Sequence, residues 1–210
     1  MANMSTAFGD LLIKARCSEN EFYEFQKELS GYLNSGEYGA DFEPANDFES
    51  NDGCCEVSVG FDGWGRWAFE ENLKRFGTWA ENSAFDGLAF LKKFDFQLVF
   101  EFTDHEPGMQ TLYTETASVT HKADAPWAEC AFEEIDYEEK DYTYENLVEC
   151  EVYNEDDIIE IDDADSLIEF LGEDGEELSK EAVESYCSDH SGEIMHDYDI
   201  PDIVEEISNY

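Results

Sequence analysis

The amino-acid sequence predicts an α+β fold, with a mainly antiparallel sheet that carries helices on one face. Two stretches, Cys55–Asp62 and Asp95–Thr103, alternate apolar and polar residues as half-buried strands do. Residues 18–36 instead repeat apolar side chains at helical spacing. Helices that precede and separate strands, followed by a hairpin, indicate helices on one face of an antiparallel sheet. A later change in composition predicts two units, an α+β unit over residues 1–123 and a smaller, strongly acidic α/β unit over residues 124–210.

The first predicted helix begins after Ser18. Ser18 and Glu21 have the spacing of a capping box, in which each side chain bonds the backbone of the other residue. The apolar face that follows consists of Phe22, Phe25, Leu29 and Tyr32 or Leu33. Asn34–Gly36 is a typical helix end. A short apolar piece, Phe8–Ile13, precedes the helix, and a polar loop, Glu37–Gly53, follows it.

The next region is predicted as strand, turn and two helices. The strand Cys55–Asp62 is followed by Gly63-Trp64-Gly65, whose glycines predict a turn. Helical spacing of apolar residues then extends over Arg66–Phe76 and from Asn82 or Ser83 to Phe94.

A hairpin or meander is predicted after these helices. The strand Asp95–Thr103 leads to a turn at Glu106-Pro107-Gly108-Met109. Gln110–His121 is rich in Thr, Tyr and Val and returns as a strand, and Trp127–Tyr137 is a candidate fourth strand.

The acidic half also shows patterns of regular structure. Two short strands are predicted at Leu147–Tyr153 and Ile158–Ile161, with a tight turn between them. Three helices follow: one capped by Asp163 or Asp165 and ending at Leu171, one ending at Cys187, and one starting at Pro201.

The net charge of −43 excludes several classes of partner. Residues 124–210 hold 32 of the 54 acidic residues and two lysines. Nucleic-acid phosphates and anionic membranes are contacted through Lys and Arg, so we expect neither nucleic-acid nor membrane binding. The chain has no apolar run long enough to span a membrane, no signal-peptide core and no C-x-x-C among its six cysteines. We therefore expect a cytoplasmic protein with reduced thiols.

No motif of the sequence indicates catalysis or a cofactor. G-x-S-x-G and P-loop patterns are absent, and paired carboxylates are too numerous to indicate any one enzyme. An EF-hand loop that places Gly175 at position 6 puts Glu181 correctly at position 12. It also puts Phe170 and Gly172 at ligand positions 1 and 3, where neither offers a carboxylate. We expect a protein that is not an enzyme and uses no cofactor.

One zinc site remains as an alternative. Cys187, His190 and His196 follow one another at loosely metal-like spacing, with Cys150 or Asp189 as a fourth ligand.

Rows of acidic residues are the strongest functional signal. Carboxylates three or four residues apart on helices, or two apart on strands, form rows with separations of about 5–7 Å. Such rows can enter a basic groove in place of phosphates, and they speed association with a cationic surface. We predict that the following residues bind a partner: Glu138, Glu139, Asp141, Glu149, Glu151, Glu155, Asp156, Asp157, Glu160, Asp162, Asp163, Glu173, Asp174, Glu176 and Glu177.

Two resemblances place the chain on mobile genetic elements. The segment FDFQLVFEFTDHEPGM, within Cys55–His121, resembles the YubB-type domain of phages and plasmids, which implies a ferredoxin-like fold for the first unit. The acidic half, with segments such as ESYCSDHSGE and DIVEEI, resembles Ard-type anti-restriction proteins and acidic anti-CRISPR proteins that mimic DNA.

These observations predict a non-enzymatic phage or mobile-element inhibitor. It would block the nucleic-acid-binding site of a basic host protein, either a CRISPR nuclease or a restriction enzyme, in the bacterial cytoplasm. The alternatives are an acidic interaction module, a salt-adapted domain without mimicry and the zinc-binding protein. The sequence leaves open whether the protein forms a homodimer.

Overall fold

The structure, a computed structural model, describes residues 4–36, 39–66 and 68–210, with the side chain of Glu176 outside the description. The chain divides into two compact units, Met1–Asp141 and Tyr142–Tyr210. The sequence places this boundary earlier, after residue 123. The difference arises because the strand Ala131–Lys140 pairs with the sheet of the first unit.

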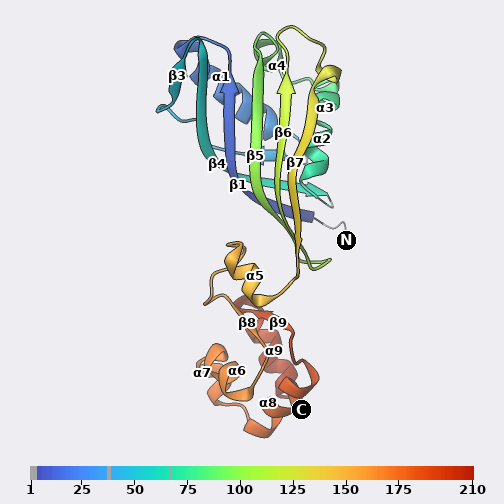
Figure 1. The fold of residues 1–210 in the computed structure, drawn as a ribbon. Coiled ribbons are helices and arrows are strands. Elements are labelled where there is room, and N and C mark those ends of the chain that lie inside the picture. The colour runs from blue at the N-terminus through green and yellow to red at the C-terminus, as the bar shows by residue number, and fades with distance from the viewer. Residues whose placement is uncertain (1–3, 37–38, 67) are drawn as a thin grey trace. The chain divides into compact units, whose positions relative to one another are not determined.

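The first unit is built on a seven-stranded sheet with the order β2-β4-β1-β5-β6-β7, in which β3 also pairs with β4 (Figure 1). Every pairing between these described strands is antiparallel, as predicted. The strands are β1 (Met4–Ala15), β2 (Gly39–Asp41), β3 (Glu49–Asn51), β4 (Cys54–Arg66), β5 (Phe96–Glu106), β6 (Thr111–His121) and β7 (Ala131–Lys140).

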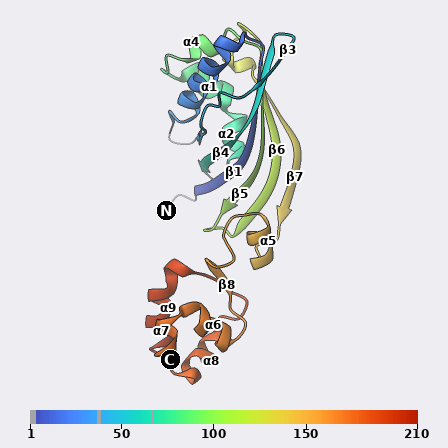
Figure 2. The same ribbon diagram turned by 90° about the vertical axis from the view of Figure 1, so that its left-hand side faces the viewer.

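The helices of this unit lie on one face of the sheet (Figure 2). They are α1 (Glu19–Leu33), α2 (Glu70–Lys74), α3 (Phe76–Asn82), α4 (Leu88–Leu91) and the 3₁₀ turn η1 (Trp127–Glu129). Phenylalanines from both layers fill the space between them. Phe25 of α1 packs edge-on against Phe96, with ring centroids 5.4 Å apart, and Phe61 packs in the same way against Phe100 at 5.2 Å. Burial of each such ring contributes about 1.5–3 kcal/mol.

Local signals predicted part of this unit correctly. The helix capped by Ser18 and Glu21 is α1, and both capping-box hydrogen bonds are present. The strands around the turn that begins at Pro107 are β5 and β6. The predicted fourth strand is β7, shifted to begin at Ala131.

Other predictions in this unit are wrong. Gly63-Trp64-Gly65 lies inside β4, because its glycines make room for packing: a Cβ on Gly63 would come within 2.6 Å of the Phe69 ring. The apolar piece Phe8–Ile13 belongs to the central strand β1, and the predicted loop contains β2 and β3. The helix predicted up to Phe94 is reduced to the short helix α4. Residues 37, 38 and 67 lie outside the described residues.

The element order differs from that of a ferredoxin-like domain. Without the short strands β2 and β3, the first unit reads strand, helix, strand, helices and then three strands, β5, β6 and β7. A ferredoxin-like unit reads β-α-β-β-α-β.

The second unit combines small helices with a two-stranded sheet, in which β8 pairs antiparallel with β9. Its core gathers Leu167, Val183, Met195 and Ile207. Its elements are α5 (Tyr144–Glu149), β8 (Ile158–Glu160), α6 (Ala164–Leu171), α7 (Glu173–Glu176), α8 (Lys180–Asp189), β9 (Ile194–His196), the 3₁₀ turn η2 (Asp197–Asp199) and α9 (Ile200–Ile207).

The helices α6, α8 and α9 confirm the predictions made for this half. The strand predicted at Leu147–Tyr153 is wrong, because the hydroxyl of Thr143 accepts a hydrogen bond from the Asn146 N–H and starts the helix α5. The tight turn predicted after it does not form a hairpin, since β8 pairs with β9.

Candidate functional site: two acidic surfaces

One face of the sheet in the first unit is open. No described helix of this unit covers the face opposite α1–α4 (Figure 2). Side chains alternate along each strand, so directly paired residues on neighbouring strands share a face. Eight exposed carboxylates lie on the open face and are called here the acidic face: Asp10, Asp41, Glu49, Asp62, Glu101, Glu133, Asp136 and Glu138.

Strand pairing fixes the spacing of these carboxylates. Asp10 lies directly opposite Glu101, and Asp62 lies directly opposite Asp41. Paired strands are about 4.8 Å apart. Like charges in such pairs destabilise a sheet, and the usual effect of a cross-strand pair is about 0.2–1 kcal/mol. The acidic face therefore retains repulsion that neutral residues would remove.

The edge strand β7 supplies three carboxylates of the acidic face. Glu133, Asp136 and Glu138 face the open side, opposite Ser118, Thr116 and Thr114 of β6. An irregularity in the pairing sets Ile135 outside the ladder, and 54% of this residue is exposed. Tyr137, whose ring centroid lies 5.4 Å from that of Tyr113, is 46% exposed. The strand thus combines charge with apolar contact area.

The second unit has an acidic surface of its own. A hollow of about 640 Å³ is lined by apolar residues that include Phe170 and by five of the acids that the sequence singled out, Glu155, Asp156, Glu160, Asp162 and Asp163. A neighbouring hollow shares Asp162 and Asp163. The Ser166 backbone N–H, together with its hydroxyl, holds the pKa of Asp163 below its ordinary value, so this cap of α6 is ionised at neutral pH.

The remaining predicted partner-binding residues are distributed over both units. Asp141 is the last residue of the first unit, and Glu149 and Glu151 flank the end of α5. Asp157 accepts a hydrogen bond from the Asn154 side chain. Glu173, Asp174 and Glu177 are exposed at α7, where the Glu176 side chain lies outside the description. Their role in binding stays a prediction.

The acidic residues of β7 do not form one row, because they divide between the two faces of the sheet. Strand alternation sends Glu138 to the open side of the sheet and Glu139 to the helix side, where Glu139 lies opposite Tyr113.

The proposed zinc ligands do not converge among the described residues. Cys187 is buried in α8, and the His190 ring stacks on Tyr186, with centroids 4.2 Å apart. The His196 ring stacks on Tyr198 instead, at 4.8 Å, and burial lowers the pKa of His196. In the described part of the chain, the one group of metal-type ligands found together is Glu70, Glu115 and Glu134.

Three carboxyl groups of the first unit are buried on the helix side of the sheet: Asp104, Glu106 and Glu115. Burial raises the pKa of Asp104 to about 6, although a hydrogen bond from the Phe69 N–H, 2.6 Å long, acts in the opposite direction. Burial, followed by the charges of Glu70 and Glu134, raises the pKa of Glu115 to about 8. These acids lie on the inward side of β5 and β6 and are not part of the acidic face.

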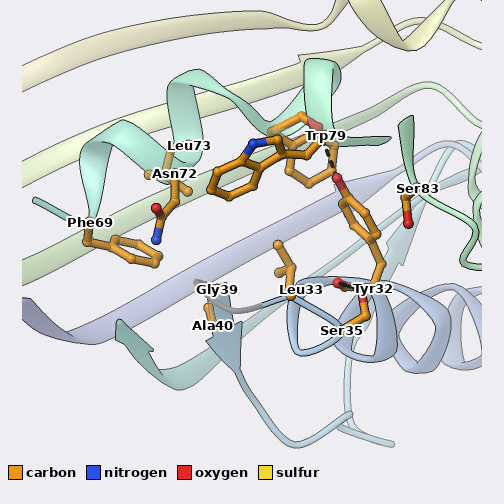
Figure 3. Close-up of a pocket in the computed structure, with 12 residues that line it drawn as sticks. Tyr32, Leu33, Ser35, Gly39, Ala40, Phe69, Asn72, Leu73, Trp79 and Ser83 are labelled. Carbon is orange, nitrogen blue, oxygen red and sulfur yellow. Dashed lines mark hydrogen bonds between the residues drawn. The ribbon is translucent and has the colours of Figure 1, made fainter. Parts of the chain in front are cut away.

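An apolar pocket of about 380 Å³ lies where α1 ends, between β2, α2 and α3 (Figure 3). The Tyr32 hydroxyl donates to the Phe76 carbonyl at 2.9 Å, and the Asn72 amide donates to the Trp64 carbonyl at 2.6 Å. These polar groups of the lining are thus engaged with the backbone. Residues 37 and 38, which link the lining residues Gly36 and Gly39, are outside the description, and we assign the pocket no function.

Sequence reasoning missed the acids that the first half adds to the acidic face. Asp10, Asp41, Glu49, Asp62 and Glu101 are dispersed over five strands, and only the pairing register brings them together. Alternation in Cys55–Asp62 already places Asp62 on the polar side, which is the available local signal.

Comparison with known proteins gives no assignment: no family model, curated protein or solved structure matches the chain. Within residues 4–36, 39–66 and 68–210, no helix has the length and apolarity needed to cross a membrane.

Proposed function

We propose that this protein is a non-enzymatic inhibitor that presents carboxylates where a nucleic acid places phosphates. Its target is a basic nucleic-acid-binding protein, and the resemblances in the sequence favour a host defence nuclease, either a CRISPR effector or a restriction enzyme. On this proposal the protein acts in the bacterial cytoplasm and binds neither nucleic acid nor membranes directly.

The observation that carries the proposal is the acidic face. The open face of the sheet holds eight exposed carboxylates in a register fixed by strand pairing, and they include two like-charge pairs on neighbouring strands. A surface made only for solubility gains nothing from pairing like charges. A basic groove compensates this repulsion on binding, because its Lys and Arg residues lie opposite the carboxylates.

The edge strand β7 supports a specific contact as well as an electrostatic one. Ile135 and Tyr137 are both exposed on this strand. Tyr137 lies opposite Glu115 and faces the helix side, so Ile135, next to Asp136, is the apolar anchor available to a partner at the acidic face. Aromatic and aliphatic anchors of this kind supply much of the free energy at protein interfaces, while surrounding charges set the association rate.

Affinity capture from a bacterial lysate at moderate salt tests the proposal first. We expect the protein to retain a basic nucleic-acid-binding protein, and DNA or RNA of that protein's own type to displace it. A captured target that holds its nucleic acid and this protein together, without competition, contradicts mimicry.

A pair of matched triple variants then tests which acidic surface makes contact. The first variant combines Glu133→Gln, Asp136→Asn and Glu138→Gln on β7, and the second combines Asp156→Asn, Asp157→Asn and Glu160→Gln in the second unit. Both remove three charges, so both weaken long-range steering to a similar extent.

We expect the β7 variant to raise the Kd for the captured target at least tenfold, with part of the loss persisting in 0.5 M NaCl, where steering is screened. The second variant should lose affinity only at low salt. If the two variants lose affinity equally at low salt and neither loses affinity in 0.5 M NaCl, the acidic face does not contact the target.

A further inference from the structure

Three carboxylates from different elements meet on the helix side of the sheet. Glu70 lies in the first turn of α2, Glu115 on β6 and Glu134 on β7, and one carboxylate oxygen of each lies within 4.8 Å of the other two. Pairing brings β6 and β7 together here, since Glu134 lies opposite Ala117 and Glu115 opposite Tyr137. The helix α2 packs against β6. These residues are called here the carboxylate trio.

The carboxylate trio contains two buried oxygens that have no hydrogen-bond partner among the described residues. Glu115 is 5% exposed, and within the described residues its Oε1 atom has no hydrogen-bond partner. The buried Oε1 atom of Glu70 likewise has none there. Buried polar atoms are nearly always paired, and an unpaired carboxylate is among the most costly groups to bury. Two such atoms at one place indicate that a ligand belongs there.

The charges around the trio define what that ligand is. The Lys74 ammonium lies 2.6 Å from the second oxygen of Glu70 and neutralises one of the three carboxylates. It lies 5.7 Å from the centre of the Phe132 ring, which holds it to one side. Lys74 also pairs with Glu71, outside the trio, so at least two negative charges remain when all three carboxylates of the trio are ionised. One divalent cation neutralises two charges. The donors are all carboxylate oxygens, which are preferred by hard cations.

We propose that the carboxylate trio binds a single divalent cation, with Ca²⁺ preferred over Mg²⁺. Two oxygens that are each about 2.4 Å from one Ca²⁺ ion lie at most about 4.8 Å apart, and the oxygens of the trio lie within that limit. Mg²⁺ demands near-ideal octahedral geometry and gives up its water molecules reluctantly, whereas Ca²⁺ accepts irregular sets of carboxylate oxygens. Exposed Glu134 leaves one side open to the water molecules that complete the coordination shell.

The cation would join three elements that are distant in sequence. It would link the edge strand β7, through Glu134, and the start of α2, through Glu70, to β6, which carries Glu115. The inference does not depend on the function proposed above, because the trio and the acidic face lie on opposite sides of the sheet.

Calorimetric titration of the chelator-treated, full-length protein with CaCl₂ tests the site. Diffuse binding to a chain of charge −43 is suppressed in 0.15 M NaCl, where the Debye length is about 8 Å. Two variants remove ligands: Glu115→Gln at the buried centre and Glu134→Gln at the exposed side. Glu129→Gln is the matched control, because it removes one exposed carboxylate of the same unit outside the trio.

We expect one Ca²⁺ to bind the wild type, with Mg²⁺ at least tenfold weaker. Both ligand variants should weaken Ca²⁺ binding at least tenfold, whereas Glu129→Gln should not change it. Calcium at one hundred times its Kd should raise the melting temperature of the wild type by about 5–10 °C. In EDTA at a pH above 8, where Glu115 is ionised, Glu115→Gln should melt above the wild type, because the buried charge is gone.

The outcomes separate a cation from the other candidate occupant, a proton held between carboxyl groups. Calcium isotherms that are the same for the wild type and for both ligand variants overturn the proposal. A wild type whose melting temperature does not respond to Ca²⁺ overturns it as well, and then favours the proton. If Glu115→Gln fails to fold, Glu134→Gln alone decides, since its side chain is exposed.

Discussion

The two units carry a similar negative charge in very different ways. The first unit, Met1–Asp141, has 30 acidic residues and ten lysines or arginines. The second unit, Tyr142–Tyr210, is about half as long and has 24 acidic residues and a single lysine. Charge per residue is therefore more than twice as high in the second unit, which also has the smaller core.

This difference sets a similar negative charge against cores of different size. In the first, a large aromatic core holds a stiff sheet, and the fold tolerates the buried carboxyl groups of Asp104 and Glu115. In the second, exposed acids cap helices, as Asp163 does for α6, but they repel one another across a small core. We therefore expect the second unit to be the less stable of the two.

Substitutions in the two cores should change the free energies of unfolding of the two units the most. Phe100 is fully buried in the first unit, and Leu167 is fully buried in the second. Phe100→Ala should lower the free energy of unfolding of the first unit by about 3–5 kcal/mol, and Leu167→Ala should lower that of the second by about 2–5 kcal/mol.

Hydrogen exchange measured segment by segment during urea titration reports each unit separately. Each core variant should shift the transition of its own unit, because the two cores are separate clusters. If either variant shifts both transitions equally, the chain unfolds as one cooperative unit and the comparison fails.

Buried and exposed acids should respond to pH with opposite signs. The pKa of Asp104 rises from 3.8 to about 6 on folding, so the folded state binds the proton more tightly than the unfolded state. The stability that protonated Asp104 contributes to the fold is fully present below pH 3.8 and is lost as the pH rises toward 6. Asp104→Asn should equal the wild type near pH 3.5 and exceed it by up to about 3 kcal/mol above pH 6.

Asp163→Asn is the matched substitution in the second unit. Because hydrogen bonds from Ser166 lower the pKa of Asp163, its ionised form stabilises α6 above the ordinary pKa of aspartate. This variant should destabilise the second unit at neutral pH, and the effect should fade as the pH falls below about 4. Urea titrations at several pH values measure both. If Asp104→Asn and Asp163→Asn both stabilise or both destabilise their units at neutral pH, buried and exposed acids do not differ in the way proposed.

Salt should change the stabilities of the two units to different extents, by less than the substitutions above. Raising NaCl from 0.02 to 0.5 M shortens the Debye length and screens repulsion between exposed carboxylates. We expect the free energy of unfolding of the second unit to rise by roughly 1–2 kcal/mol more than that of the first. Thermal melts at matched protein concentration, with sucrose as an uncharged control, test this. If the free energy of unfolding rises equally in both units, charge repulsion is not stronger in the second unit.

The smallest predicted effect concerns a single helix cap in the second unit. The Ser179 hydroxyl accepts a hydrogen bond from the Ala182 N–H at the start of α8. Ser179→Ala should cost that unit about 1 kcal/mol. Ser188→Ala, at an exposed position late in α8, serves as the control and should have no measurable effect. Chemical denaturation of the two variants side by side measures the difference.

Local sequence signals predict the elements whose formation depends on neighbouring residues. The helices α1, α6 and α8 all begin at recognisable caps, Ser18, Asp163 and Ser179. The strand β5 is predictable because its phenylalanines alternate with other residues. The Thr143 cap is equally local, but the apolar residues after it favour a strand in the sequence pattern.

Features that depend on distant pairing could not be predicted in this way. The central position of β1 follows from its contacts with both β4 and β5, which are far from it in the chain. The acidic face and the carboxylate trio depend on the same kind of pairing. Glu115 does show one local sign, because it occupies an inward position of an alternating strand, where a carboxylate is out of place.

The edge strand β7 also determines how copies of this protein behave toward one another. In the described sheet β7 pairs on one side with β6, so the backbone groups of its other side can pair with another strand. At neutral pH its five carboxylates make two such edges repel. In acid, carboxylates lose their charge, and the repulsion between two edges is lost with it. The strand that keeps copies dispersed at neutral pH is therefore the place where self-association should begin in acid.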